Sequence, residues 1–355
     1  MKAIFKLLAI SIFLLTTGGC TELITLDTPR TDRHLAVEGF INNLDEGSWV
    51  RLSTTTPGLE GIGSNLLGIN ANVSLIHDDQ VFLYEEVSPG SYFLAPEGFQ
   101  GQVGETYRLR IVTANNDTYE SEEVTIPAAV PIASTRAELV VMVLEIEGIE
   151  TTQYFHDVYA EFVNSEKDQF IKIENQGMAE VFVDYEVTRC GLNLDLPRGP
   201  AAGLSCWSLR DPISSEIKLT TNIGLNRSEN YDVVGIRVPF QFQARYVTTL
   251  TAHNMSVGSF NYWENVRQQL NNVGGPFDPP IQPLPGNLTN TEDSGDIVLG
   301  YFHAYGTSVA KTCFDRSDVP ETADIPIIGP PCLITCEEWW APATFDDPVG
   351  LELCE

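Results

Sequence analysis

Basic side chains are scarce in this sequence, which has 20 Lys and Arg against 49 Asp and Glu and a formal net charge of −29. Proteins that bind nucleic acid or anionic lipid headgroups use clustered Lys and Arg, and an acidic surface repels both ligands. The composition therefore argues against nucleic acid as a partner. Charged residues make up only 19% and hydrophobic residues 43% of the chain, which is typical of a folded protein rather than a disordered acidic tail.

Catalytic and cofactor-binding motifs are also missing. None of the five histidines belongs to a His-Glu-x-x-His zinc motif, and the sequence has no phosphate loop, dinucleotide fingerprint or EF-hand loop. The segment "GTSVA" at Gly306 falls short of the Gly-x-Ser-x-Gly elbow of serine hydrolases. We therefore expect a protein that is not an enzyme and that holds no metal and no cofactor. Calcium on Glu292, Asp293 and Asp296 is the alternative to a solvated acidic loop.

Long apolar runs are absent after the first residues, since no later segment approaches the roughly 20 residues that span a bilayer. The chain opens with lysines and an apolar run from Leu7 to Leu15, as in a signal peptide. Thr17-Gly18-Gly19 then leads into Cys20, which resembles a bacterial lipobox. We expect removal of residues 1–19 and membrane attachment through acylation of Cys20, at about 0.8 kcal/mol per buried CH₂. An ordinary signal peptide with a coincidental cysteine is the alternative.

Six cysteines remain when Cys20 is set aside, and an even number in an exported protein predicts disulfide bonds. Cys190 and Cys206 flank a Gly- and Pro-rich excursion and form the expected first pair, worth about 3 kcal/mol in the chain-entropy model. The other four are expected to staple the C-terminal tail in an undetermined pairing: Cys313, Cys332, Cys336 and Cys354. A zinc site among those four is the alternative.

Alternation of apolar and polar residues between turn sequences predicts an all-β fold. After a tether over residues 20–33, residues 34–131 carry about seven short strands, which predict an immunoglobulin-like β-sandwich. In one of these strands Tyr107, Leu109 and Ile111 are expected on the core face. Residues 132–355 have longer strands and predict a larger antiparallel β domain with one helix and a disulfide-stapled tail.

Two segments of this second region allow sharper expectations. Residues 235–253 alternate as one strand, in which Pro239 indicates a sheet edge or a bulge. The segment "NYWENVRQQLNNVGGP" predicts a helix near 261–273 that begins with a capping box of Asn261 and Glu264. The apolar face of this helix is expected to consist of Tyr262, Val266, Leu270 and Val273.

Tryptophans beside the cysteines are the candidate ligand-binding residues. Trp207 adjoins Cys206, and Trp339 and Trp340 closely follow another cysteine. Aromatic faces on disulfide-held loops can stack on sugar rings or fill a partner's pocket, so a peptide or a glycan is the expected ligand. The simpler interpretation is that these rings pack against the disulfides as a small satellite core. His303 is expected to be a hydrogen-bonded core or edge histidine.

An ordered series of motifs carries a family resemblance. The motifs are "LAVEGFI", "VSPGSYFL", "GQVGETYRLRI", "TYESEEVTIP", "YWENVRQQLNNVGGPFDPP", "PGN" and "VLGYFHAYGTS". Together with the lipobox they resemble a large uncharacterised lipoprotein family of Bacteroidetes, whose genes usually sit beside TonB-dependent outer-membrane receptors. The resemblance covers nearly all of the chain after residue 19, and its helix–proline–"GN…LGYF" block is the most specific part.

This resemblance implies an outer-membrane lipoprotein that works with a TonB-dependent receptor in nutrient uptake, as an accessory or as a substrate-capture partner. It implies no catalytic residues. We expect the cell surface as the location. The periplasmic face is the alternative, because only Glu22 and Asp27 supply negative charge just after Cys20. A surface adhesin or envelope scaffold, and a cell-surface hydrolase, are the alternative functions.

Overall fold

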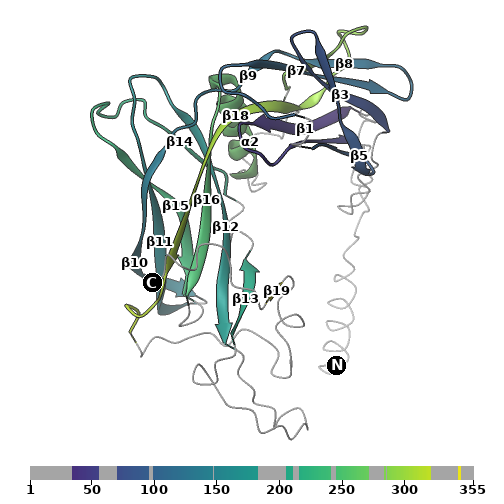
Figure 1. The fold of residues 1–355 in the computed structure, drawn as a ribbon. Coiled ribbons are helices and arrows are strands. Elements are labelled where there is room, and N and C mark those ends of the chain that lie inside the picture. The colour runs from purple at the N-terminus through teal and green to yellow at the C-terminus, as the bar shows by residue number, and fades with distance from the viewer. Residues whose placement is uncertain are drawn as a thin grey trace, which may run out of the picture. The chain divides into compact units, whose positions relative to one another are not determined.

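The computed structural model describes residues 34–55, 70–95, 99–146, 148–182, 205–210, 216–240, 245–271, 284, 286–320 and 343–344 (Figure 1). Most of these residues lie in strands of three sheets, and α2 (Val257–Asn271) is the helix among them. This arrangement confirms the prediction of a mostly β protein with antiparallel sheets, and α2 overlaps the predicted helix near 261–273. In the part of the chain that is described, no helix is long and apolar enough to cross a membrane.

The largest sheet has ten strands in the order β19-β13-β12-β16-β18-β1-β2-β6-β5, with β14 beside β12. The bounds of these strands are β1 (Leu35–Asn42), β2 (Ser48–Thr54), β5 (Glu85–Ser88), β6 (Ser91–Leu94), β12 (Phe170–Phe182), β13 (Ser205–Arg210), β14 (Lys218–Thr221), β16 (Tyr246–Asn254), β18 (Leu299–Phe314) and β19 (Ala343–Thr344).

The two smaller sheets have six and three strands. The six-stranded sheet runs β17-β8-β7-β3-β4, with β9 beside β7, and the three-stranded sheet runs β10-β11-β15. The bounds of these strands are β3 (Ala71–His77), β4 (Gln80–Leu83), β7 (Thr106–Thr113), β8 (Thr118–Ser121), β9 (Val124–Thr125), β10 (Ile132–Ile146), β11 (Ile149–Phe162), β15 (Tyr231–Pro239) and β17 (Leu288–Asn290).

The first hydrophobic core lies between the six-stranded sheet and the β1, β2 and β6 part of the large sheet. Alternate residues of a strand point to opposite faces, so each strand contributes every second side chain. Val37 and Leu52 meet Leu75 and Leu109 in this core, and all four are at most 1% exposed. Tyr107 and Ile111 are equally buried, which confirms the predicted core face of β7.

The second core lies between the three-stranded sheet and the β12 and β16 part of the large sheet. Val158 and Phe162 of β11 pack against Ile171 of β12 and Leu250 of β16, and these four side chains are almost fully buried. Burial of each such side chain stabilises the fold by about 1.5–3 kcal/mol. The two cores therefore lie along one continuous sheet.

Strand β18 belongs to both cores. Its first half pairs in parallel with β1, and its second half pairs antiparallel with β16. Phe302 from the first half is fully buried in the first core, and β17 adds a further edge strand beside β8. The first core thus recruits chain from far beyond residue 131, a pairing that the sequence analysis did not foresee.

The "PGN" motif fixes the start of β18. A Cβ on Gly286 would lie 1.4 Å from the carbonyl oxygen of Gly300, so this close approach requires glycine. The neighbouring Asn287 is buried, and its side-chain amide donates to the carbonyl of Phe302 at 3.0 Å and accepts from the N–H of the same residue at 2.9 Å. The side-chain amide of Asn287 thereby makes the two hydrogen bonds to Phe302 that a neighbouring strand would otherwise make.

Residues 235–253 form two strands, and the prediction of a single strand was wrong. β15 ends at Pro239 and β16 begins at Tyr246, and the two strands lie in different sheets. Proline lacks the N–H that a central strand needs, and β15 is the edge strand of the three-stranded sheet. The edge assignment made for Pro239 is therefore confirmed.

Helix α2 begins four residues earlier than predicted, at Val257. Its N-cap is Ser256, whose Oγ accepts from the N–H of Ser259 at 3.2 Å. The predicted capping box was therefore wrong: Glu264 instead forms an ion pair with Arg267 at 2.6 Å inside the helix. Leu270 is 63% exposed, so it does not belong to the buried face.

Candidate functional site

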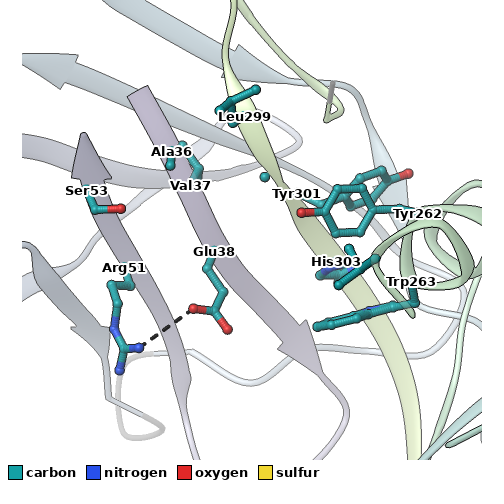
Figure 2. Close-up of a pocket in the computed structure, with 12 residues that line it drawn as sticks. Ala36, Val37, Glu38, Arg51, Ser53, Tyr262, Trp263, Leu299, Tyr301 and His303 are labelled. Carbon is teal, nitrogen blue, oxygen red and sulfur yellow. Dashed lines mark ion pairs between the residues drawn. The ribbon is translucent and has the colours of Figure 1, made fainter. Parts of the chain in front are cut away.

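A half-open cavity of about 370 Å³ lies between helix α2 and the outer face of the large sheet (Figure 2). Strands β1 and β2, helix α2 and strand β18 supply its walls. Its lining residues are Ala36, Val37, Glu38, Arg51, Ser53, Tyr262, Trp263, Val266, Leu299, Gly300, Tyr301 and His303.

Strand register brings the polar and aromatic side chains of this cavity together. Glu38 of β1 lies opposite Tyr301 of β18 on one side and Arg51 of β2 on the other. Two residues further along β18, His303 projects on the same face as Tyr301. The intervening Phe302 points to the opposite face, into the first core. The cavity therefore sits on the solvent side of a sheet whose other side is packed.

Stacked rings form one wall of the cavity, as Figure 2 shows. The ring centroid of His303 lies 4.6 Å from that of Tyr301 and 5.3 Å from that of Trp263, with interplanar angles of 24° and 18°. Tyr262 of α2 completes the wall at 5.1 Å from Tyr301, inclined by 41°. The rings of Tyr262, Trp263 and Tyr301 are half-buried, so part of each face stays open to the cavity.

His303 is a neutral group in this wall. It is 4% exposed, and burial, together with the electrostatic influence of the neighbouring Lys172 and His253, holds its pKa well below the ordinary value of 6.5. Its Nδ1 hydrogen-bonds Ser259 Oγ at 2.6 Å. The prediction of a hydrogen-bonded core histidine is therefore confirmed. Because Nδ1 is occupied, Nε2 is the ring nitrogen that remains for a ligand.

A polar network stands behind the aromatic wall. Trp263 donates its Nε1–H to Tyr305 Oη at 3.0 Å, and Lys172 Nζ lies 3.7 Å from the centroid of the Trp263 ring. Lys172 also bonds Glu174 at 2.5 Å. A hydrogen bond from His253 and the charge of Lys172 lower the pKa of Glu174 to about 2. The aromatic wall therefore packs against the ion pair of Lys172 and Glu174.

Glu38 and Arg51 form the facing wall. Arg51 Nη1 lies 3.7 Å from Glu38 Oε2, and both side chains are more than half exposed. An exposed ion pair of this kind contributes about 0–1 kcal/mol to stability, because solvent screens it. Breaking this ion pair therefore costs little free energy, and both side chains can turn toward a ligand.

The side chains of the three tryptophans predicted to bind a ligand lie outside the described residues, so their role stays a prediction. Trp207 lies on β13, paired with Glu180 of β12 and Thr344 of β19, and the placement of its side chain is outside the described part. Trp339 and Trp340 lie wholly outside it, as does Cys20. The cavity residues of β1, β2, α2 and β18 were not predicted as ligand-binding residues from the sequence. The pattern that could have indicated those of α2 and β18 is the aromatic alternation in "GYFHAY" together with the adjacent "YW".

The cysteines are described only in part. Cys313 lies on β18 and is disulfide-bonded. β12 and β16 lie between β13 and β18, so the backbones at Cys206 and Cys313 are at least about 14 Å apart, too far for a disulfide with each other. Cys190, Cys332, Cys336 and Cys354 lie outside the described residues, and their pairing stays a prediction.

Hydrogen bonds fix the conformation of the acidic loop after β17. Asp296 accepts hydrogen bonds from Tyr119 Oη at 2.9 Å and from Asn290 Nδ2 at 3.0 Å. Asn290 Oδ1 in turn accepts from the N–H groups of Glu292 and Asp293. Across the described ranges, no group of three or more His, Cys, Asp or Glu side chains is arranged to hold a metal ion. These contacts favour the solvated-loop interpretation.

Comparison with known proteins gives a family match. A family model described as "Domain of unknown function (DUF4249)" matches residues 21–311. None of the curated proteins compared with the chain matches it. Among solved structures, the crystal structure of trypsin activated alpha-2-macroglobulin from Escherichia coli matches at 11% identity with a TM-score of 0.19. That match covers 64% of this chain and 15% of the other, and a likeness of this size carries no argument about function.

Proposed function

The chain belongs to the DUF4249 family, and on that premise we propose that it is a non-enzymatic outer-membrane lipoprotein that captures a ligand for a TonB-dependent receptor. The observation that supports capture is the half-open, aromatic-walled cavity of about 370 Å³. Its volume lies in the range of about 300–1,000 Å³ that is usual for small-molecule sites. Its mixture of apolar rings and a few polar groups is also usual for such sites.

The chemistry of the cavity favours binding over catalysis. General acid–base catalysis works best with a group whose pKa lies near the working pH and that reaches the reacting atom. His303 has a pKa held well below 6.5, and its hydroxyl partner Ser259 is buried at 2% exposure. Glu38, the cavity's carboxylate, is paired with Arg51. These groups are suited to holding a ligand by hydrogen bonds.

The membrane and receptor parts of the proposal rest on the N-terminal segment and on the family resemblance. Acylation of Cys20 would anchor the body through a tether over residues 20–33. The cell surface is the proposed location, and the periplasmic face is the alternative. The acidic chain would approach a receptor without competing attraction to an anionic membrane surface.

The finer fold assignments are also proposals. The first core joins strands in the orders β1-β2-β6-β5 and β4-β3-β7-β8. These orders match the ABED and C′CFG sheets of an immunoglobulin-like sandwich, with β1 as strand A. We propose that fold for the first core, and we propose that disulfides staple the C-terminal tail.

Co-purification tests the receptor partnership. The full chain, extracted from outer membranes in mild detergent, is expected to bring down a TonB-dependent receptor. Cys20→Ala should move the protein out of the membrane fraction, whereas Cys206→Ala should leave it there, because only the first cysteine carries the anchor. Recovery of the native chain without any such receptor would contradict the partnership, and membrane retention of Cys20→Ala would contradict the anchor.

A further inference from the structure

The floor of the cavity presents side chains to a ligand and presents no unpaired strand edge. Its floor is β1, which is paired in parallel with β18 on one side and antiparallel with β2 on the other. A peptide that binds as an added strand needs an unpaired strand edge for its main-chain hydrogen bonds. β1 is paired on both sides, so the floor of the cavity favours a compact ligand over a peptide that adds to β1 as a strand.

The charge of the cavity disfavours an anionic ligand. Glu38 and Arg51 lie 3.7 Å apart and largely cancel each other. An anionic ligand would be repelled by Glu38 and by the −29 charge of the chain. A carboxylate accepts hydrogen bonds and a guanidinium donates them. A pair of adjacent hydroxyl groups can satisfy both at once, since each hydroxyl donates and accepts.

The aromatic wall favours a ligand with a flat, weakly polar face. Tyr262, Trp263 and Tyr301 present ring faces from a helix and a strand, at angles that surround one side of the cavity (Figure 2). Aromatic faces carry negative charge density and attract the slightly positive C–H edges of a neighbouring group. A pyranose ring has such C–H faces, and hydroxyl groups project from its rim.

We propose that this cavity binds a pyranose unit of a neutral glycan, stacked on Trp263 and Tyr262, with its hydroxyls bonded to Glu38 and Arg51. The inference rests on the proposed capture function, because it names the ligand class of the same site. His303 Nε2, at the back of the aromatic wall, supplies a further hydrogen bond to the bound sugar. The polar groups therefore set which hydroxyls are recognised, and the rings supply the contact area.

Titration calorimetry on the full chain in mild detergent tests this proposal. The probes are neutral oligosaccharides of glucose, mannose, xylose and galactose, with oligogalacturonate and a mixture of short peptides for comparison. We expect at least one neutral oligosaccharide to saturate the protein with a Kd of about 1 mM or tighter. The anionic sugar and the peptides should not compete with it.

Variants locate the binding site. Glu38→Gln should weaken sugar binding about tenfold by removing a charged acceptor, which corresponds to about 1.4 kcal/mol. Glu145→Gln, which alters an exposed carboxylate on β10, should leave binding unchanged. Tyr262→Phe keeps the ring and should bind as the native chain does, whereas Tyr262→Ala should lose most binding. Circular dichroism on each variant confirms that the fold is retained.

The outcomes separate this inference from the proposed function. If no neutral oligosaccharide saturates the protein, or if Glu38→Gln and Tyr262→Ala bind it as the native chain does, the sugar site is overturned. Peptide binding together with receptor co-purification would then leave capture standing without a glycan. Saturable sugar binding that depends on Glu38, in a chain that brings down no receptor, would uphold the glycan site and overturn the partnership.

Discussion

The indole of Trp263 stacks on the imidazole of His303, with ring centroids 5.3 Å apart and planes inclined by 18°. This contact fastens helix α2 to strand β18. Because Trp263 also donates a hydrogen bond to Tyr305 Oη, the helix is held at two successive positions on the same face of that strand. The cavity wall is therefore a direct product of helix docking, and a change that loosens the helix opens the site.

Trp263→Ala is expected to lower the free energy of unfolding by about 2–3 kcal/mol. The side chain is half-buried, so the loss should be somewhat below the 3–5 kcal/mol of a fully buried tryptophan. Trp263→Phe keeps a stacking ring and removes only the bond to Tyr305, so it should cost about 1 kcal/mol. Urea unfolding measures both variants. Equal stability of native chain and Trp263→Ala would contradict the docking role.

Asn287→Ala is expected to destabilise the fold by about 2–6 kcal/mol. The substitution leaves the buried N–H and C=O of Phe302 without the amide that bonds them both, and each unpaired group costs about 1–3 kcal/mol. Thr289→Ala, two residues along the chain and exposed, is the matched control and should change stability by less than about 0.5 kcal/mol. Thermal unfolding of the two variants measures the difference. Equal unfolding midpoints for Asn287→Ala and Thr289→Ala would contradict the role given to Asn287.

Stability is expected to fall as the pH drops below about 6.5, the value at which histidine binds a proton in the unfolded chain. Burial lowers the folded-state pKa of His303 and of His156, so the unfolded state takes up protons first and is favoured by acid. Each such group contributes at most about 1.4 kcal/mol per pH unit. Above 6.5 both contributions are fully present.

His303→Phe should reduce this slope between pH 6.5 and 5, because it keeps a ring beside Tyr301 and removes one titrating group. The slope should not vanish, since His156 still titrates. The folded-state pKa of Glu174 is lowered to about 2, so its contribution is lost between about 4.5 and 2, outside this window. Urea midpoints across the pH range measure the slope, and an unchanged slope in the variant would contradict the assignment.

Calcium is expected to leave thermal stability unchanged. The carboxylate of Asp296 already accepts hydrogen bonds from Tyr119 and Asn290, and proximity to Asp296 adds to burial in raising the pKa of Tyr119 to about 12. Asp296→Ala should cost about 1–2 kcal/mol, because the Tyr119 hydroxyl loses its partner. Differential scanning fluorimetry with Ca²⁺ and with EDTA checks this; a midpoint that rises with Ca²⁺ would indicate a metal site.

Strand content and the faces of strands could be predicted from the sequence because they follow from a local period of two. Tyr107, Leu109 and Ile111 were assigned to the core by alternation, and they lie there. Alternation says which side chains share a face, but it does not say which strand lies alongside. The parallel pairing of β1 with β18 is therefore absent from any local pattern.

The candidate site depends on strand pairing and helix docking, which local sequence patterns do not reveal. Tyr301 and His303 could be placed on one face of a strand, but their meeting with Glu38 follows from strand pairing and their meeting with Trp263 follows from helix docking. The helix start was misplaced for a related reason. Asn261 and Glu264 satisfy a capping pattern, yet Ser256 occupies the cap because the chain leaves β16 only two residues earlier.

The parallel pairing of β1 with β18 also sets an order of events during folding. Asn43, just after β1, accepts a hydrogen bond from the N–H of Thr307, 264 residues later in the chain. During synthesis β1 thus keeps one edge open until β18 (Leu299–Phe314) has been made. An open strand edge invites pairing with other chains. The pairing of β1 with β18 is therefore a late step of assembly, and until then the edge of β1 is the one most exposed to pairing with other chains.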